Sequence, residues 1–460
     1  MMRFTPDRAA IRFGCGLSPR QPAPGSVDDM LSAVSGPDQA AQDFPIPGMA
    51  PVFEMALRER KARRATRQFK GTDQYEAAFE KVKIERRAMR DMAAVWFGQA
   101  LMRRAQTPDG FRERLASFWT DHFTATGKVL FLKFAPVNYT EEAIRPHVAG
   151  RFGDMLRAAI THPLMLHYLD QAKSAGPESR VAKRNPKRGL NENLARELLE
   201  LHTLGVGGPY TQTDVRQLAE LLAGLSFTHV DGFVFAKNQA DPGVKTVLGK
   251  RYGGKNRLAS IYSVLDDLAA HPATARHVAQ KLAVHFVGDT PDADLITALE
   301  RRFLDTGGDL LAVYEVMLNH PGSWVVGPRN VKQPIDFIGS SLRALDLQPR
   351  QMPQKKAARM RKFFYSPLVM MGQTWGHPAG PDGWPEADED WITPQRLAAR
   401  LQWAMATPLR LRRTLPDPRE FVDIALGSEA PENVRFAARA AESRPEGVGV
   451  VLSSAAFQRM

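Results

Sequence analysis

The sequence predicts a mainly α-helical protein: a multi-helix globular body with a small β-hairpin insertion and a long loop rich in Pro, Gly and Trp. Apolar residues recur at helical spacing along most of the 460 residues, as they do in helices that bury one face. Between Thr228 and Tyr252 this period is lost, and short apolar runs alternate with Gly and Asp-Pro-Gly breakers. A hydrophobic content of 43% and a charged content of 24% are ordinary for a globular protein.

Residues 1–227 are expected to form a first helical region. Two segments in it carry apolar faces at helical spacing, at Phe111, Leu115, Phe118 and His122, and at Val215, Leu218, Leu222 and Leu225. Thr211 and Asp214 have the spacing of a capping box, which begins a helix. Gly224 suits the left-handed conformation that often ends one. The second of these helices should therefore begin after Thr211 and end near Gly224.

Residues 228–255 are expected to form the β insertion, as one or two small hairpins, and residues 256–460 a second helical region. The three segments are also compatible with one continuous domain. In the last region, the loop 371–391 contains three tryptophans among many Pro and Gly breakers. So many breakers argue against regular structure, but tryptophans are seldom left in solvent. We therefore expect a long loop that is ordered against the body.

Charge gives one indication about partners. The net charge is +12, and residues 58–90 hold twelve Lys or Arg against five Asp or Glu. Two explanations remain open for this segment: a solvated pair of helices, or a patch that binds an anionic partner. No zinc-finger, RNP or OB-type motif accompanies the charge, so we do not expect nucleic acid as the partner. No apolar run reaches the roughly 20 residues that span a membrane.

The N-terminal segment "MMRFTPDRAAIRFGCGLSPR" has charges scattered through it and no apolar stretch before a small-residue cleavage site. A cytoplasmic location is therefore expected, whereas a true start upstream of Met1 would be compatible with export. Cys15 is the only cysteine, which excludes an internal disulfide framework and a Cys-rich zinc site. We expect Cys15 to be a small buried side chain.

The segment "GLNENLARELLELHTLG", residues 189–205, brings acidic and histidine side chains together in one predicted helix. At 100° per residue, Glu197 and Glu200 lie on the polar half and His202 on the apolar half. Glu200 and His202 point about 160° apart. A helical metal site needs ligands three or four residues apart on one face. We therefore do not expect a local chelate, and we expect His202 to face the core.

Other histidines also fall on apolar helix faces, which suggests two alternatives. His122, His167 and His202 could meet in the interior, with carboxylate partners at Asp121, Asp170 and Glu192. Such a cluster could bind a divalent transition metal through His122, His167, His202 and Asp121, or perform acid–base chemistry with His122, His202 and Glu192. Alternatively, each is a separate core histidine with its own hydrogen-bond partner.

Other catalytic templates are missing or weak. No Walker A loop, dinucleotide-binding glycine motif, nucleophile elbow or H-E-x-x-H motif occurs in the sequence. His277, Lys281 and His285 form a row four residues apart, which could contact phosphate or ligate a metal. The lysine in the middle favours a solvated or anion-facing row instead.

Three segments carry a resemblance to a known family: "FWTDHF" (118–123), "NENLARELLELHTLGVGGPYTQTDV" (191–215) and "GHPAGPDGWPEADEDWITPQRLAARLQWA" (376–404). They resemble the bacterial family named domain of unknown function 1800. The resemblance implies no established activity. It implies that many members are exported, and that a phosphatase-like or sulfatase-like protein encoded nearby is a candidate partner. Relatives often carry His-Asp before a segment like "KTVLG", where this chain has Ala240 and Asp241.

Two functional hypotheses follow. The first is a binding or assembly partner of another protein, favoured by the basic segment 58–90 and by the lack of nucleophile and cofactor motifs. The alternative is an enzyme, with or without a metal, that has an interior His/carboxylate site. We favour the first.

Overall fold

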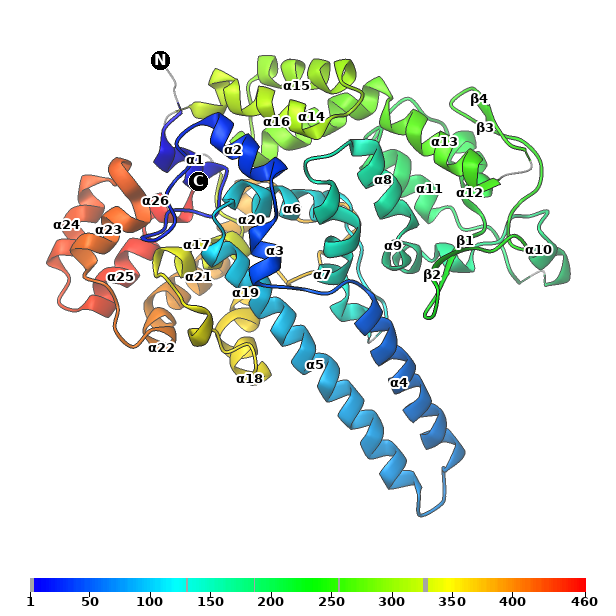
Figure 1. Ribbon diagram of the computed structural model, residues 1–460, viewed down its shortest axis with the longest axis horizontal. Helices are drawn as coiled ribbons and strands as arrows, with labels where there is room; N and C mark the ends of the chain where they lie inside the picture. Colours follow the sequence, from blue (N-terminus) through cyan, green and yellow to red (C-terminus); the bar gives the residue numbers. More distant parts are fainter. Residues whose placement is uncertain (1–3, 130, 186, 255–256, 326–329) are drawn as a thin grey trace.

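The computed structural model describes residues 4–129, 131–185, 187–254, 257–325 and 330–460. Helices account for 63% of the chain and strands for 4%, which confirms the mainly α-helical class. Figure 1 shows one large body of helices, from which a pair of long helices projects as an arm. No helix of the described residues is long and apolar enough to cross a membrane.

The helices that precede the strands include several short 3-10 and π-helical turns, which are given η labels. In chain order they are α1 (Pro6–Arg12), α2 (Val27–Ser35), α3 (Gln39–Asp43), α4 (Ala50–Gln68), α5 (Tyr75–Gln106), α6 (Gly110–His122), η1 (Leu132–Phe134), α7 (Pro136–Tyr139), η2 (Thr140–Ile144), η3 (Arg145–His147), α8 (Phe152–Thr161), α9 (Pro163–Tyr168), η4 (Gln171–Lys173), α10 (Arg180–Arg184), α11 (Asn193–Glu197), η5 (Leu198–His202) and α12 (Gln212–Leu222).

The β insertion consists of two separate antiparallel hairpins. Strands β1 (Leu225–Thr228) and β2 (Gly232–Phe235) form the first, and β3 (Lys245–Val247) and β4 (Lys250–Tyr252) form the second. The first strand begins three residues before the predicted insertion, so Leu225 is a strand residue and not the end of a helical face. Gly224, with φ +105°, makes this early turn, because such a φ is readily adopted only by glycine. The predicted boundary at 255 and 256 lies outside the described residues.

The second helical region begins at Arg257 and is again interrupted by short turns. Its elements are α13 (Arg257–Ala269), α14 (Pro272–Val287), α15 (Ala293–Asp305), α16 (Leu310–Asn319), η6 (Pro321–Trp324), α17 (Pro334–Ala344), η7 (Pro349–Gln351), α18 (Ala357–Met360), η8 (Arg361–Tyr365), α19 (Ser366–Met370), α20 (Asp388–Trp391), α21 (Pro394–Ala406), α22 (Pro408–Leu411), α23 (Pro418–Leu426), η9 (Gly427–Glu429), α24 (Glu432–Ala440), α25 (Arg444–Ser453) and α26 (Ala455–Gln458).

The predicted loop 371–391 runs against the body, as expected, but its last residues form the short helix α20. Trp391 is buried, while Trp375 and Trp384 are half-buried. Trp375 packs on Phe97 of α5, with ring centroids 4.5 Å apart. Burial of these indole rings therefore holds the loop against the body.

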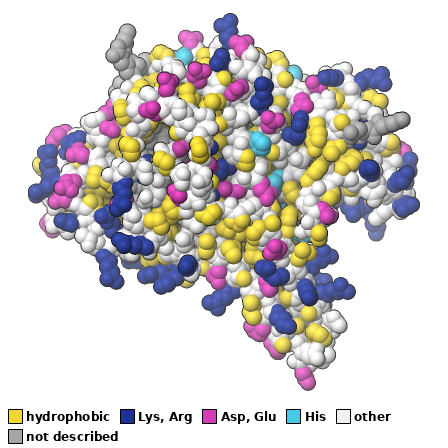
Figure 2. Space-filling model, viewed as in Figure 1, with side chains coloured by type: hydrophobic (Ala, Val, Ile, Leu, Met, Phe, Trp, Pro, Cys, Tyr) yellow, Lys and Arg dark blue, Asp and Glu magenta, His cyan; other side chains and the backbone are white. Residues whose placement is uncertain are grey.

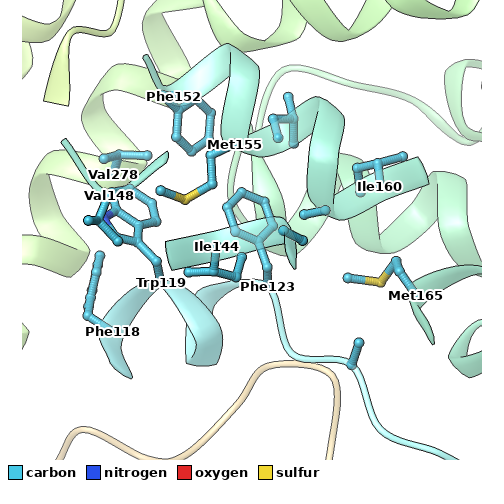
Figure 3. Close-up of a cluster of buried hydrophobic side chains, with 14 of the residues drawn as sticks. Phe118, Trp119, Phe123, Ile144, Val148, Phe152, Met155, Ile160, Met165 and Val278 are labelled. Carbon is cyan, nitrogen blue, oxygen red and sulfur yellow. The ribbon is translucent and has the colours of Figure 1, made fainter. Parts of the chain in front are cut away.

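The described residues form two hydrophobic clusters in the body. The larger one is built around α6, α8 and α9, and Figure 3 shows Trp119 of α6 and Phe123, the residue that caps α6, lying against Phe152 of α8. The second joins the inner part of α5 to α17, α21, α23 and α25. Because α5 contributes to the first cluster through Trp96 and to the second through Phe97, it links the two halves of the body.

The helix expected over 189–205 differs from a regular α-helix. Residues Asn193–Glu197 are α-helical, and Leu198–His202 form a π-helical turn, η5. Two more π-helical turns occur at η2 and η8. Such turns often accompany functional sites because they redirect side chains. His202, the last residue of η5, is fully buried, as the helical geometry predicts.

Candidate functional site

His122 and His202, eighty residues apart, meet in the interior. Nε2 of His122 lies 3.2 Å from the carbonyl oxygen of His202, and Nδ1 of His202 lies 3.0 Å from the carbonyl oxygen of His122. Each ring therefore donates an N–H to the other residue's backbone. Burial lowers the pKa of His122 well below its ordinary value and that of His202 to about 3. Both imidazoles are neutral at physiological pH.

A third histidine completes this histidine cluster, which we define as His122, His202 and His277. The His277 ring, on α14, lies 5.9 Å from that of His122, and its Nε2 donates to the carbonyl oxygen of Leu201, 3.0 Å away. Nδ1 of His122 and Nε2 of His202 are buried and have no hydrogen-bond partner among the described residues. The cluster therefore has unused acceptor nitrogens.

The other predicted members lie elsewhere. Nε2 of His167 accepts a hydrogen bond from the backbone N–H of Lys128, 3.2 Å away, and Asp170 forms ion pairs with Lys128 and Lys173. Glu192 is half-buried, and it contacts Arg196 and accepts a hydrogen bond from Gln212.

In the described ranges, no three or more His, Cys, Asp or Glu side chains are grouped so that they could hold a metal ion. A divalent transition metal at this place stays one of the two alternatives that the sequence left open, and of its candidate histidines the structure brings His122 and His202 together.

Asp121 faces away from the histidine cluster, toward the Trp-rich loop. Its Oδ1 accepts a hydrogen bond from the backbone N–H of Trp384 at 2.8 Å. Burial, followed by the negative charge of Glu386, raises the pKa of Asp121 to about 8. This carboxyl group is therefore largely protonated at neutral pH and could act as a general acid.

Glu386 itself is held by His285 of α14. Nδ1 of His285 lies 2.9 and 3.0 Å from the two carboxylate oxygens, and its Nε2 lies 3.1 Å from Arg114. Burial opposes ionisation of Glu386, but the charges of His285 and Lys281 lower its pKa on balance. The sequence predicted that His277, Lys281 and His285 form a solvated or anion-facing row. His285 is not solvated, because it is buried, but its ring does face an anion, the Glu386 carboxylate.

A cavity of about 200 Å³ lies beside these groups, between α6, the start of α17 and the Trp-rich loop. Asp121, Thr120 and His285 line one part of it, and Trp375 and Trp384 another. Thr140 and Tyr365, from two of the three π-helical turns, also line it. The cavity thus combines hydroxyl, carboxyl and indole groups around one space, which is the usual composition of a small-molecule site.

Buried ion pairs surround this cavity. Arg103 makes a bidentate contact with Glu141, and Arg145 is paired with Glu113 and Asp38. Arg104 and Arg114 both approach Asp336, at 3.5 and 3.4 Å. Sequence reasoning missed these residues. Some of them could have been found from the sequence, because Arg112, Glu113 and Arg114 follow one another within a helix that carries many apolar residues. Three consecutive charged residues cannot all avoid the core, and a charge that enters the core needs an opposite charge beside it.

The arm formed by α4 and α5 is a second candidate site. Figure 1 shows its outer part projecting beyond the other helices, and α4 packs mainly on α5. Ion pairs Arg58–Glu85 and Arg86–Glu59 join the two helices. Figure 2 shows Lys and Arg side chains along the arm with hydrophobic side chains between them. The basic segment 58–90 thus lies on a pair of helices. This agrees with the first of the two explanations given for its charge, a solvated pair of helices.

A comparison with protein families gives one match. The family model described as "Protein of unknown function (DUF1800)" matches residues 8–459, nearly the whole chain. No curated protein and no solved structure gives a match.

Proposed function

The chain belongs to the DUF1800 family of proteins of unknown function, and we propose that it is a binding or assembly protein that docks onto an acidic protein through its α4–α5 arm. The observation that carries this proposal is the projection of two basic helices beyond the body. A helix that packs little apolar surface against the rest of its own protein gains little stability from that packing. A surface held out in this way is suited to contact with another molecule.

Charge on the arm is mostly available to a partner. Seven exposed basic side chains between residues 58 and 90 have no carboxylate within 4.0 Å among the described residues: Arg60, Lys61, Arg64, Arg67, Lys70, Lys81 and Arg90. Such cations contribute to binding when an opposite charge approaches, and they also accelerate encounter. The partner surface should therefore carry a cluster of Asp and Glu.

Exposed apolar side chains on the same arm favour a protein over a polyphosphate. Ile84 is 62% exposed, Met92 41% and Leu57 39%. Acidic side chains, such as Glu80 and Asp91, also stand among the basic ones and would repel a phosphate backbone. Interfaces between proteins combine an apolar centre with a polar rim, which matches this mixture. A phosphatase-like or sulfatase-like protein encoded nearby is one candidate, because the family resemblance suggests such a partner.

Cross-linking in the native host tests the proposal. A photoreactive phenylalanine analogue replaces Ile84 in one variant and the exposed Leu409 of the body in a matched control. We expect adducts with an acidic protein from position 84 only. The identified protein is then purified, and its binding is measured by size-exclusion chromatography at low and high salt. Adducts with nucleic acid, or equal labelling from both positions, would contradict the proposal.

A charge-reversal variant provides the quantitative test with the purified partner. Arg60→Glu, Lys61→Glu, Arg64→Glu and Lys81→Glu together should weaken binding at low salt by at least about tenfold, because each lost contact is worth a few tenths to one kcal/mol. The matched control changes the same number of exposed basic residues on the body: Lys355, Lys356, Arg410 and Arg413. Equal loss in both variants would show that only net charge matters.

The alternative function, an enzyme with an interior His/carboxylate site, is supported by one observation. Asp121, a carboxyl group with a pKa near 8, lines a cavity next to His285. Hydrolysis of p-nitrophenyl acetate, phosphate and glucoside by the wild type, lost in Asp121→Asn at unchanged circular dichroism, would support it. A rate no higher than that of the variant for all three substrates would count against it.

A further inference from the structure

A second and larger cavity, of about 680 Å³, lies on another side of the body. Its walls come from α1, α2, the beginning of α6, η9 and the segment 14–25 that connects α1 to α2. That segment, "GCGLSPRQPAPG", is rich in Gly and Pro and contains no regular element. The walls thus consist largely of backbone and small side chains. One charged side chain from the core, Arg343, reaches the cavity.

Arg343 lies on α17 and is 5% exposed. Its Nε donates to the carbonyl oxygen of Gly16 at 2.8 Å, and its Nη1 donates to that of Thr107 at 2.7 Å. Its Nη2 donates no hydrogen bond to a residue that the structure describes. The guanidinium group therefore has donors left at a cavity wall.

The charge of Arg343 has no counterion among the residues that the structure describes. No carboxylate oxygen of the described ranges lies within 4.0 Å of its guanidinium. By contrast, the similarly buried Arg103, Arg112 and Arg145 each contact a carboxylate. Burial lowers the pKa of Arg343, and the Cys15 side chain acts in the opposite direction.

Neither Cys15 nor Thr107, the two groups beside Arg343, neutralises the charge of its guanidinium. Burial raises the pKa of the Cys15 thiol to about 12, so it is uncharged at physiological pH. The carbonyl of Thr107, at the end of α5, offers only the partial negative charge of a helix C-terminus. Arginine stays protonated in proteins. A buried cation without an anion costs several kcal/mol, which a bound anion would remove.

We propose that this cavity binds a small hydroxy or amino acid, whose carboxylate pairs with Arg343. A carboxylate suits the site because the planar guanidinium group forms parallel hydrogen bonds with it. Arg343 is the one Lys or Arg among the residues of the described ranges that line the cavity. A single cation matches one negative charge and not a polyphosphate.

The acidic side chains of the cavity specify the rest of the ligand. Asp7, Asp29, Asp109 and Asp423 also line it. Asp109 is paired with Arg112 and Asp423 with Arg435, while Asp7 accepts hydrogen bonds from Ser428. None of their carboxylate oxygens lies within 4.0 Å of the Arg343 guanidinium. They would accept hydrogen bonds from hydroxyl or ammonium groups, and they would repel a second anionic group.

Binding to L-lactate and L-serine tests the proposal, with sodium chloride and inorganic phosphate at equal ionic strength as comparisons. The wild type should bind the two acids in calorimetric titration and should melt at a higher temperature in their presence, since a ligand of the folded state stabilises it. Arg343→Met should weaken binding at least tenfold, and the surface substitution Arg410→Met should leave it unchanged.

A second variant covers the case in which Arg343→Met fails to fold. Ala33 lines the cavity and is half-buried on α2, so Ala33→Phe should fill the space while Arg343 remains. We expect it to reduce binding of both acids at least tenfold. No heat from either acid, equal stabilisation by chloride, tighter binding of phosphate, or unchanged binding in Ala33→Phe would overturn the proposal. The result does not depend on the α4–α5 arm.

Discussion

The carboxyl group of Asp121 should make the stability of the protein depend on pH in a way that one substitution removes. Burial, followed by the charge of Glu386, raises its pKa from 3.8 to about 8, and Asp382 acts in the same direction. The charge of Lys281 and the hydrogen bond from Trp384 act in the opposite direction. Asp121→Asn keeps an oxygen that can accept the Trp384 N–H but cannot ionise. Comparing the two proteins isolates this ionisation.

The magnitude follows from linkage between protonation and folding. The unfolded chain loses the Asp121 proton near pH 4, whereas the folded protein keeps it until about pH 8. Protonated Asp121 therefore contributes its full share to the free energy of unfolding below about pH 4, and this contribution is lost as the pH rises to about 8. Each pH unit in this window lowers the free energy of unfolding by about 1.4 kcal/mol. From about pH 5 to about pH 7, the wild type should lose about 3 kcal/mol relative to Asp121→Asn.

Urea denaturation followed by circular dichroism, at several pH values between about 5 and 8, measures this difference. Every other titratable group remains in both proteins, so its contribution largely cancels from the difference. A difference in free energy that stays constant over the whole range would refute the reasoning, because it would mean that Asp121 ionises at its ordinary pKa.

Three further predictions concern contacts around the cavity and the core. Arg145→Met leaves Glu113 and Asp38 without their cation and should lower the free energy of unfolding by about 3–5 kcal/mol, while the double variant with Glu113→Leu should lose less; urea denaturation measures both. Tyr314→Phe removes the oxygen that accepts from Trp119 Nε1 at 2.6 Å, so a loss of about 1–3 kcal/mol is expected in the same assay, and none would mean that the bond is replaced. Gly383→Ala places a Cβ 2.5 Å from the Asp121 carboxylate at a φ of +87°, and it should displace the Trp-rich loop. Tryptophan fluorescence reports that displacement, and an unchanged spectrum would contradict it.

Helices could be predicted from the sequence where apolar residues mark one face of the helix or where a capping motif marks its start. The apolar row ending at His122 predicted α6, which runs over Gly110–His122, and the Thr211–Asp214 capping box begins α12 as expected. His202 was expected to face the core from its angle on a regular helix, and it does so. The π-helical turn at Leu198–His202 was not predicted, because a single added residue per turn leaves no clear mark on the apolar pattern.

Contacts between distant segments could not be predicted in the same way. The histidine cluster joins α6, η5 and α14, and only the tertiary fold decides that His277 belongs to it while His167 does not. The same holds for Arg343, whose partners Gly16 and Thr107 lie far away in the sequence. An apolar period indicates which face is buried, but it carries no information about the opposing surface.

The length and continuity of α5 have a mechanical consequence. This single helix of 32 residues runs from the tip of the arm to Gln106, a distance of about 48 Å. Its inner end carries Arg103 and Arg104 at the wall of one cavity, and its final cap, Thr107, holds the arginine of the other. If the whole helix turned by about 10° about its inner end, its tip would move by about 8 Å. A force applied to the tip would act in reverse on both cavity walls.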